Sequence, residues 1–568
     1  MRSPERYLHR MNERWRVALL LAVAMLVYGN TLPNSFTLDD DVYILSNPAV
    51  TGLSVRGLFE PTRANNIFRP VTFATFAVNW AVSGAQPFGY HLVNVLLHTA
   101  VLLLLYLVFR TLLEPVPRAT TVALAAAWLF AVHPIHTEAV ASVVGRSELL
   151  AAGFVLAAWL LHLRDRPVFA LVCFVLALLS KESAVAFIAL VLAGDYARGK
   201  LKPLHRYGWI AGVTVMYIAV LWKVQGGRFG GKGISFLDNP LASLPARWRI
   251  LNALRVAWKY AGLHVYPATL SCDYSYDAIP LYANWRHTVP AAVAAALVLA
   301  ILIWALRNRR GEWVLAGAIY LAGFAVTANL LVPTGTIMGE RLAYLPSAGF
   351  CLLVALIWIQ LENHKRRLAW AVFAILVAAL AVRTVARNRD WRDNLTLFSA
   401  AVQAVPGSAK MHADLGGEFM KRGQLDAARM EFQTALHTYP DFPEALEPYG
   451  LVESRMGHDQ EARRLLENAL SLTGKDNMYY DFRAVNLATQ LMKLGENDGA
   501  LKLLNQEIAT CPGCGRAWSN RAVIRYGRGE VASARADAEM ALRLDAANTQ
   551  AQNLLSLLDA PAAVAAPR

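Results

Sequence analysis

Three consecutive aspartates, Asp39, Asp40 and Asp41, follow the first long apolar stretch of the sequence. A helix cap needs only one such side chain, because a single oxygen atom is enough to satisfy an orphan backbone amide. Neighbouring carboxylates can also accept a proton from a hydroxyl group, hold that group by hydrogen bonds, or bind a divalent cation. The three aspartates therefore indicate a chemical site directly after the first apolar segment.

The segments that position these aspartates are apolar and long. Of the 568 residues, 56% are hydrophobic and 17% are charged, which indicates a polytopic membrane protein with more than one domain. Because a span needs about 20 apolar residues, the sequence predicts about eleven spans. They are 15–33, 91–113, 119–135, 147–163, 167–180, 183–196, 207–224, 289–307, 311–331, 342–361 and 367–386. We expect the first to be a retained helix, because no small-residue cleavage site follows it.

Basic residues predict the orientation of these spans. Arginines and lysines gather before the first span and in alternate short loops, among them "RGKLKPLHR", "RNRR" and "KRR". By the positive-inside rule this side is cytoplasmic. The net charge of +14 thus indicates topology, and we expect no nucleic-acid partner. The segments 33–90 and 225–287, the "HPIHTE" turn and the C-terminal region then face outward.

Other ionisable and polar residues share the outward side with the aspartates. They include Arg69, His91, His133, His136, Glu138, Arg146, Glu148, Lys181, Glu182, Glu340, Arg341 and Tyr344. Each one alone could be an interfacial anchor or a helix cap. A charged group at a membrane boundary costs several kcal/mol unless it is paired with an opposite charge or hydrated, so the whole set indicates a polar cavity.

The "HPIHTE" turn also raises a zinc hypothesis. The spacing of His133, His136 and Glu138 matches no standard short zinc motif, Pro134 breaks the helix, and no cysteine is near. A hydrogen-bonding role toward a sugar or a phosphate is the better interpretation.

After residue 387 the composition changes to short amphipathic helices with the 34-residue period of tetratricopeptide repeats. Gly423, Gly457, Gly495 and Gly529 occupy the same turn position, with a four-residue insertion before the third. Four repeats therefore cover about 409–548. "WRDNLTLFSAAVQAVPGS" predicts the second half of an earlier repeat, and 549–560 predicts a capping helix. The concave face of such an array holds extended peptides.

The sequence "CPGC" at Cys511 and Cys514 has the spacing of a redox pair. It lies at a repeat turn and not beside a βαβ pattern, which favours a structural disulfide or two free thiols over an oxidoreductase.

The chain resembles the transmembrane and tetratricopeptide-repeat-containing (TMTC-like) proteins, which are linked to protein O-mannosylation and grouped with the GT-C membrane glycosyltransferases. The resemblance rests on Asp39-Asp40, "FRPVTF", "YHLVNVLLH", "HPIHTEAVASVVGRSELLA", "LLSKESA", "YPATLSCDYSYDAIP" and "GERLAYLPS", and on the repeats. It implies a transferase that moves a sugar from a polyprenyl-phosphate carrier to an acceptor hydroxyl, with an acidic residue of the first outer loop as general base. Asp41 departs from the family pattern, which often has an apolar residue there.

The residues suit that chemistry. We predict Asp40 as the base and Asp39 as the second catalytic residue, since a carboxylate that accepts the hydroxyl proton contributes about 10²–10⁴-fold. Direct displacement would invert the anomeric centre. Arg146, Lys181 and Arg341, with Arg69 behind them, are candidates to neutralise the lipid phosphate. The other predicted substrate-binding residues are Asp41, His91, His133, His136, Glu138, Glu182 and Tyr344. A divalent metal, Mg²⁺ or Mn²⁺, at Asp39 and Asp40 is the one cofactor that these residues allow.

The sequence thus predicts an all-α protein. Residues 1–388 form a GT-C-like transmembrane domain, residues 389–560 a periplasmic tetratricopeptide-repeat domain, and residues 561–568 a disordered tail. The expected location is the bacterial inner membrane, with the N-terminus cytoplasmic, and the expected partners are membrane lipids, a polyprenyl-phosphate-linked sugar and a protein or peptide acceptor. Two alternatives remain: a lipid-linked sugar flippase, transporter or polysaccharide-handling membrane protein, and a scaffold whose spans tether the repeats.

Overall fold

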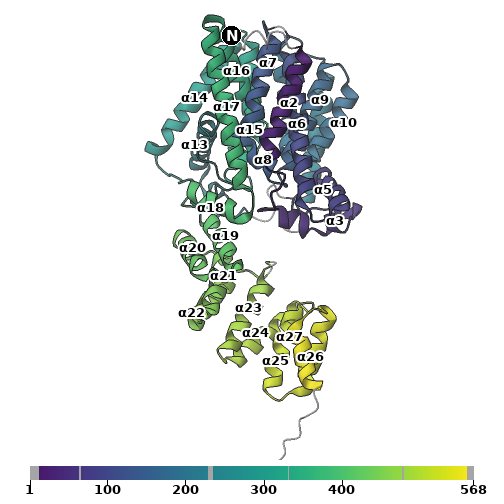
Figure 1. Ribbon diagram of the computed structural model, residues 1–568, viewed down its shortest axis with the longest axis vertical. Helices are drawn as coiled ribbons and strands as arrows, with labels where there is room; N and C mark the ends of the chain where they lie inside the picture. Colours follow the sequence, from purple (N-terminus) through teal and green to yellow (C-terminus); the bar gives the residue numbers. More distant parts are fainter. Residues whose placement is uncertain are drawn as a thin grey trace, which may run out of the picture. The chain divides into compact units, whose positions relative to one another are not determined.

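The computed structural model describes residues 12–62, 66–114, 116–227, 234–330, 332–475, 477 and 479–559. These residues form helices and loops, and no strand occurs among them, which confirms the all-α prediction. The chain divides into two compact units, Met1–Ser408 and Ala409–Arg568 (Figure 1). The predicted tail, 561–568, and the arginines before residue 12 lie outside the described residues.

Each of the eleven predicted apolar segments falls on a helix of the first unit. These helices are α2 (Glu13–Gly29), α6 (Pro87–Leu112), α7 (Ala119–Val132), α9 (Arg146–Leu163), α10 (Pro167–Leu178), α11 (Phe187–Ala197), α12 (Leu204–Val224), α14 (Trp285–Arg307), α15 (Gly311–Ala325), α16 (Ser347–His364) and α17 (Arg366–Asp390).

Length and composition qualify fewer of them as spans. Five helices among the described residues are long and apolar enough to cross a membrane: α6, α9, α12, α14 and α17. They become six if α7 and the segment Pro134–Ala141, which meet at a bend of 56°, form one span. The predicted number of eleven therefore stays a prediction. The bend lies in "HPIHTE", where Pro134 cannot continue the helix that ends at Val132.

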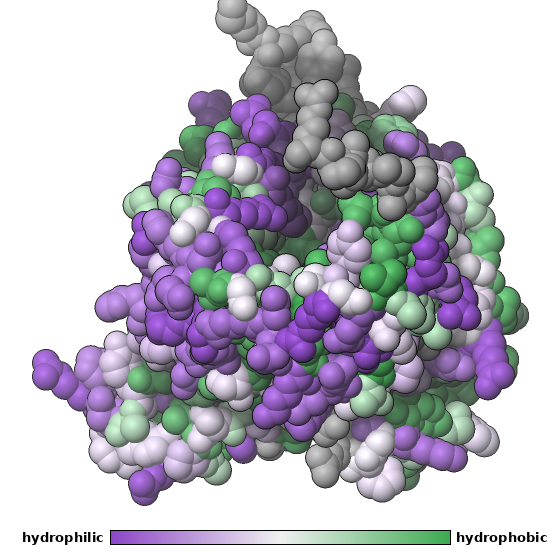
Figure 2. All heavy atoms as spheres, turned by 90° about the horizontal axis from the view of Figure 1, so that it is seen from below, coloured by the Kyte–Doolittle hydropathy of each residue, from purple (hydrophilic) through white to green (hydrophobic). Residues whose placement is uncertain are grey.

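Exposed apolar side chains on the outer helices agree with a membrane environment. Leu297, Ile301 and Trp304 of α14 are largely exposed, although a soluble protein would bury such a contiguous row. Hydrophilic side chains predominate instead on the face shown in Figure 2, where hydrophobic ones form separate patches. The inner helix α7 is by contrast buried over most of its length. Close helix contact in this core depends on small residues: a Cβ atom on Gly349 of α16 would lie 2.4 Å from the carbonyl oxygen of Ala316 in α15.

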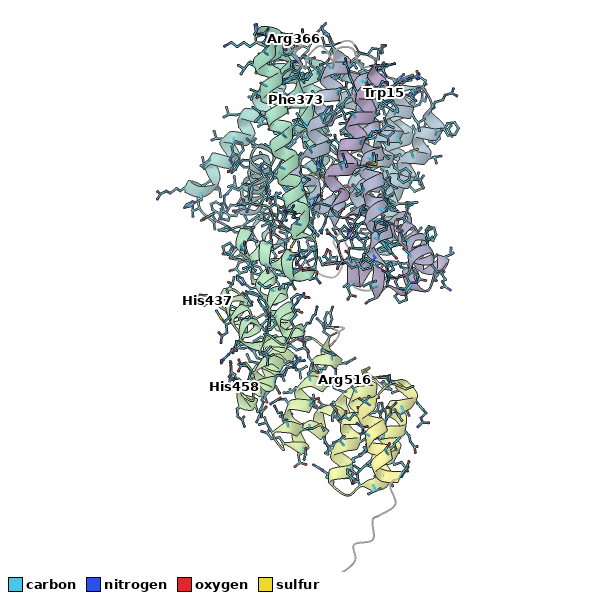
Figure 3. All side chains as sticks on the ribbon, viewed as in Figure 1. Trp15, Arg366, Phe373, His437, His458 and Arg516 are labelled. Carbon is cyan, nitrogen blue, oxygen red and sulfur yellow. A yellow bond between two sulfur atoms is a disulfide. The ribbon has the colours of Figure 1, made fainter. Side chains whose placement is uncertain are left out.

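The predicted basic loops gather at one end of the first unit. Trp15 near the start of α2 and Arg366 at the start of α17 lie together there (Figure 3). Acidic residues pair with the loop cations at this end: Arg110 with Glu13 at 2.6 Å, Arg198 with Glu114 at 3.4 Å, Arg206 with Asp165 at 2.6 Å, and Arg118 with Glu362. The common side that the sequence assigned to these loops is therefore a structural feature of the bundle.

The predicted outer loops are themselves partly helical. The loop after α2 contains η1 (Asp41–Leu45), α3 (Pro48–Thr51), α4 (Val55–Leu58) and α5 (Pro70–Ser83). The longer loop contains η4 (Pro240–Ser243) and α13 (Ala246–Val265), and short helical turns elsewhere are η2 (Pro134–His136), α8 (Thr137–Ala141), η3 (Glu182–Ala186) and η5 (Glu340–Ala343). Proline at the first position of α3 and α5 starts both helices with a preset φ.

The second unit is a stack of helical hairpins. Its helices are α19 (Ala409–Lys421), α20 (Leu425–Thr438), α21 (Pro443–Arg455), α22 (Asp459–Ser471), α23 (Tyr480–Lys493), α24 (Asn497–Thr510), α25 (Gly515–Gly527), α26 (Val531–Leu544) and α27 (Thr549–Asp559). The four glycines of the predicted turn position have φ of 72°, 86°, 78° and 79°, a conformation that disfavours side chains with a Cβ atom. The four repeats and the terminal helix are therefore as predicted.

The boundary between the units lies later than the predicted one at residue 388. α18 (Asn394–Ala404), predicted to be half of a repeat, falls within the first unit. Asp393 and Thr396 cap its start with reciprocal hydrogen bonds, and Leu397, Phe398 and Ala401 are buried. The repeat-like pattern of this helix reflects the same packing requirement, namely one apolar face on an amphipathic helix.

Candidate active site

Asp40 is completely buried and hydrogen-bonded through both carboxylate oxygens. Oδ2 accepts the backbone N–H of Thr37 at 2.9 Å, and Oδ1 accepts that of Val144, which precedes α9, at 3.0 Å. Burial, and to a smaller extent the charge of Asp39, raises the pKa of Asp40 to about 7, although the hydrogen bonds from Thr37 and Val144 oppose the shift. Asp40 thus fixes the aspartate loop to the start of α9.

Asp39 and Asp41 have different surroundings. Asp39 is partly exposed, and its side chain has no hydrogen bond or ion pair within the part of the chain that the structure describes. Asp41 is the first residue of η1 and is exposed. Among the three aspartates, Asp39 therefore combines an accessible carboxylate with a position directly beside a buried one.

Three ion pairs accompany the aspartate loop. Arg69 makes a two-pronged contact with Glu182, with Nη2–Oε1 at 2.6 Å and Nε–Oε2 at 3.1 Å. Arg341 contacts Glu138 through Nη1 at 2.5 Å and through its backbone N–H at 2.8 Å. Lys181 pairs with Glu148, and both are buried. The three pairs bring together side chains from five separate segments of the sequence.

The ion pairs form one electrostatic cluster with Asp39. Although burial alone would lower the pKa of the Arg341 guanidinium, the charges of Glu138, Asp39 and Glu148 raise it above its ordinary value. Lys181 in turn interacts with Arg69 and Glu182 as well as with Arg341. The side chains of Arg69, Arg341 and Glu182 are 15%, 32% and 40% exposed, so a ligand can reach this cluster.

Arg146 does not share that exposure. It is buried, and it donates to Asn94 Oδ1 at 2.9 Å, Asn79 Oδ1 at 2.6 Å and the Tyr90 carbonyl at 3.0 Å. Its guanidinium also lies 4.7 Å from the centre of the Phe76 ring. Arg146 therefore ties α5, α6 and α9 together, and this geometry does not support the predicted contact with a lipid phosphate.

The predicted histidines and Tyr344 lie inside the bundle. His136 contacts the Phe130 carbonyl at 2.9 Å and Ser347 Oγ at 2.6 Å. His133 contacts the His264 carbonyl at 3.0 Å, and Tyr344 contacts His98 Nδ1 at 2.7 Å. His91 is also buried. The structure does not bring these four residues to the exposed cluster, because all four are buried, and His133, His136 and Tyr344 bond to partners within the bundle.

Residues at the end of α17 also hold the aspartate loop, and sequence reasoning missed them. The Ser35 backbone donates to the Arg392 carbonyl at 2.9 Å, and the Leu38 N–H donates to Asn394 Oδ1 at 2.9 Å. Asn388 is buried and donates to Asn30 Oδ1 at 2.8 Å and to the Val27 carbonyl at 2.9 Å. The available signal was an asparagine at the end of an apolar helix, where a buried amide needs several partners.

The predicted metal site gains no geometric support. Among the described residues, the group of three potential ligands close enough to hold one ion is Asp481, Cys511 and Cys514, far along the sequence from the aspartate loop. Asp40 already uses both oxygens as acceptors for backbone amides. A divalent ion at Asp39 stays a prediction.

The fold and the site together define a helical membrane protein with a tetratricopeptide-repeat unit and an accessible carboxylate among cations. No family model matches the chain. It is similar to a protein from Caenorhabditis elegans named protein O-mannosyl-transferase F38B6.6, with 29% identity over 75% of this chain and 63% of that protein. Mouse protein O-mannosyl-transferase TMTC3 is 29% identical over 80% of this chain and 54% of its own length. The solved structure of YrrB, a TPR protein, covers 35% of this chain with 16% identity and a TM-score of 0.26.

The chain is therefore similar to TMTC-like proteins over most of its length, in agreement with the resemblance that the motifs indicate. The chain spans about half to two thirds of the length of the curated relatives it matches.

Proposed function

We propose that the chain is a membrane glycosyltransferase that moves a sugar, mannose by analogy with the names of its relatives, from a polyprenyl-phosphate carrier to a serine or threonine hydroxyl of a polypeptide. The observation that carries this proposal is the partly exposed carboxylate of Asp39, whose charge acts on Arg341 in a cluster that also contains Arg69. A group-transfer site needs a proton acceptor next to cations that stabilise an anionic leaving group.

In this proposal Asp39, and not Asp40, is the general base. A base must reach the hydroxyl whose proton it accepts. Asp39 is partly exposed and free of a hydrogen bond among the described residues, whereas Asp40 is buried and bonded to two backbone amides. Asp40 holds the loop so that Asp39 is presented to the acceptor.

The departing carrier phosphate gains negative charge as the anomeric bond breaks. Arg341 and Arg69 are the partly exposed cations of the cluster, and Glu138 and Glu182 fix their orientation. Attack of the acceptor oxygen on the anomeric carbon from the side opposite the phosphate forms the new bond, passes the hydroxyl proton to Asp39 and inverts the anomeric centre. Lys181, which is buried in an ion pair with Glu148, supplies further positive charge.

The second unit takes the role of acceptor binding in this proposal. Stacked helical hairpins expose a continuous surface for extended peptides and have no transfer chemistry of their own. We place the chain in a bacterial inner membrane, with the basic end of the bundle in the cytoplasm and the aspartate loop and the repeats in the periplasm.

The test is incubation of the purified protein with radiolabelled polyprenyl-phosphate sugars and a panel of periplasmic polypeptides. The transferase predicts label on serine or threonine, with the inverted anomeric configuration. Movement of intact labelled carrier across sealed vesicles without transfer would instead indicate a flippase. Absence of both activities with every carrier would favour a tethering scaffold.

A further inference from the structure

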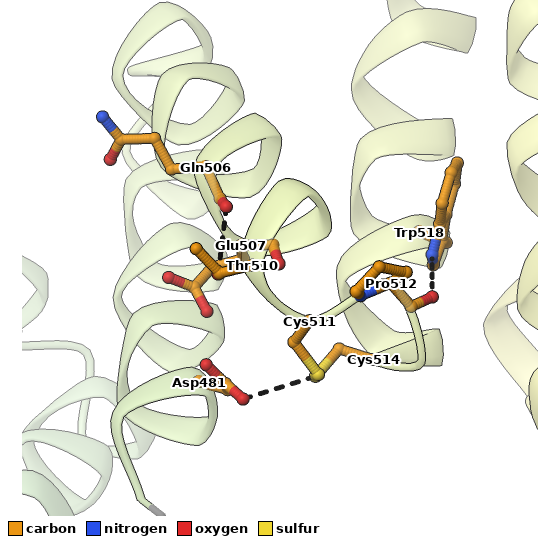
Figure 4. The surroundings of a disulfide bond; sticks show 8 residues. All are labelled: Asp481, Gln506, Glu507, Thr510, Cys511, Pro512, Cys514 and Trp518. Carbon is orange, nitrogen blue, oxygen red and sulfur yellow. Dashed lines mark hydrogen bonds between the residues drawn. A yellow bond between two sulfur atoms is a disulfide. The ribbon is translucent and has the colours of Figure 1, made fainter. Parts of the chain in front are cut away.

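The Cys511–Cys514 disulfide lies at the turn between α24 and α25, with a carboxyl group against it (Figure 4). Asp481 Oδ2, from α23, is 3.9 Å from Cys514 Sγ. The two sulfur atoms and the Asp481 carboxylate all lie within 4.8 Å of one another. Both cysteines are partly exposed, so a reactant in solution can approach the disulfide.

A second carboxyl group, that of Glu507 in α24, interacts with the carboxyl group of Asp481. Glu507 is buried and lies within hydrogen-bonding range of Asp481. Burial, together with this neighbouring carboxyl group, raises the pKa of Glu507 to about 7. Because a carboxyl group resists ionising beside another carboxylate, Glu507 holds its proton up to about neutral pH.

The position of Cys514 at a helix start favours a negative charge on its sulfur, whereas the Asp481 carboxylate disfavours that charge, so the departing sulfur needs a proton. Cys514 directly precedes α25, a helix of 13 residues, and helix N-termini stabilise thiolates. The turn itself is held by the Trp518 side chain, which donates to the Pro512 carbonyl at 2.9 Å. Cys514 is thus the sulfur that leaves most readily when the disulfide is attacked.

We propose that Cys511–Cys514 is a thiol–disulfide exchange site for a dithiol, with the Asp481–Glu507 pair as its proton donor and acceptor. A thiolate of the incoming dithiol attacks Cys511 Sγ, the disulfide bond breaks, and the Cys514 sulfur leaves with the electron pair. Cys514 takes the proton of the carboxyl pair. The second thiol of the reactant then attacks the mixed disulfide and releases Cys511, so that the reactant is oxidised by two electrons and the protein is reduced by two.

The carboxyl pair is what distinguishes this site from a structural crosslink. A crosslink needs no ionisable group beside it, and burial disfavours the charged form of Glu507 although the charge of Lys475 opposes that effect. The sequence pattern favoured a structural disulfide because no βαβ pattern surrounds it. That pattern could not show that Asp481, distant in sequence, lies against Cys514.

Reduction kinetics test the proposal on the full-length protein in detergent. The oxidised protein is mixed with dithiothreitol at pH 5.5–8.5, quenched with acid and alkylated, and free Cys511 and Cys514 are measured by mass spectrometry of their peptide. Rates are divided by the concentration of dithiothreitol thiolate. At pH 6 we expect Glu507→Gln to lower this corrected rate by about tenfold, and at pH 8.5 we expect no difference, since the pair has then lost its proton.

Asp481→Asn should give the same loss, and because Asp481 is partly exposed this variant serves if Glu507→Gln does not fold. Glu530→Gln, an exposed carboxylate of the same unit, is the matched control and should follow the parent protein. Superimposable pH profiles for the parent and Asp481→Asn would overturn the proposal. So would a disulfide that resists excess dithiothreitol until the protein is denatured.

Discussion

Replacing Asp39 and Asp40 separately distinguishes proton transfer from loop positioning. Asp39→Asn keeps the size of the side chain and removes the proton acceptor, so turnover should fall by about 10²–10⁴-fold. The Asp39 carboxylate is partly exposed, with no hydrogen bond or ion pair in the described part of the chain. Its replacement should therefore change the free energy of unfolding by no more than about 0.5 kcal/mol.

Asp40→Asn should lower the stability of the protein more, and its turnover less, than Asp39→Asn does. The Thr37 and Val144 amides both donate to Asp40, but an asparagine side chain has one oxygen and one NH₂ group. One backbone N–H then loses its acceptor in a buried site, which costs about 1–3 kcal/mol. Turnover should fall less than in Asp39→Asn, because the base is present but held less firmly.

The assay measures sugar transfer and thermal unfolding of the same detergent-purified samples. Asp41→Asn is the matched control, because Asp41 is exposed and directly follows Asp40 in the same loop. We expect Asp39→Asn to lower kcat with a parental Tm, and Asp40→Asn to lower Tm. An Asp40→Asn variant with a parental Tm and the larger loss of kcat would refute this reasoning and make Asp40 the base, as the sequence alone suggested.

Three further predictions address the cluster, its titration and the topology. Arg341→Gln should weaken lipid-donor binding and lower kcat/KM by about tenfold or more, whereas Arg118→Gln at the other end of the bundle should affect transfer little; equal donor affinity in both would contradict the role of Arg341. Burial raises the pKa of Asp40 in the folded protein, so the stability that this residue contributes is complete below about pH 4 and is lost as the pH rises through about 7. The Tm of the parent should therefore fall over this range relative to that of Asp40→Asn. Parallel Tm profiles would show that Asp40 does not titrate there. A cysteine at Asp426 should react with an impermeant thiol reagent from the periplasm and one at Lys200 only after lysis, with the parent protein as background control; the reverse pattern would overturn the orientation.

Patterns of apolarity and small residues predicted the helices well. Apolar segments had to become helices, because a backbone in lipid must satisfy its hydrogen bonds internally. Gly423 and its three equivalents predicted the repeats, since the turn requires positive φ. The number of spans was harder to predict: α10 and α11 are apolar but short, and length decides whether such a helix crosses a membrane.

The site was predicted only in part. Arg69, Lys181, Glu182 and Arg341 belong to ion pairs that interact with one another, and the charge of Asp39 acts on Arg341. Burial could not be predicted from residue type, so Arg146 and the histidines were grouped with the exposed cluster, although Arg146 is buried against Asn94 and His136 against the Phe130 carbonyl. Ranking Asp39 against Asp40 required knowledge of Val144, which is distant in sequence.

The arrangement around Asp39 follows from the energetics of charges near a membrane. An unpaired cation in this environment is costly, and each cation of the cluster accordingly has a carboxylate partner: Glu182 for Arg69, Glu148 for Lys181 and Glu138 for Arg341. Asp39 is then the additional carboxylate, whose charge acts on Arg341, in a loop that Asp40 fixes to the start of α9 and Asn394 fixes to α18. Within the described part of the chain, the Asp39 side chain has no hydrogen bond to lose when an acceptor hydroxyl binds. Because Asp40 and Asn394 accept hydrogen bonds from the backbone that they hold, in the proposed mechanism we expect their replacement to affect stability more than transfer.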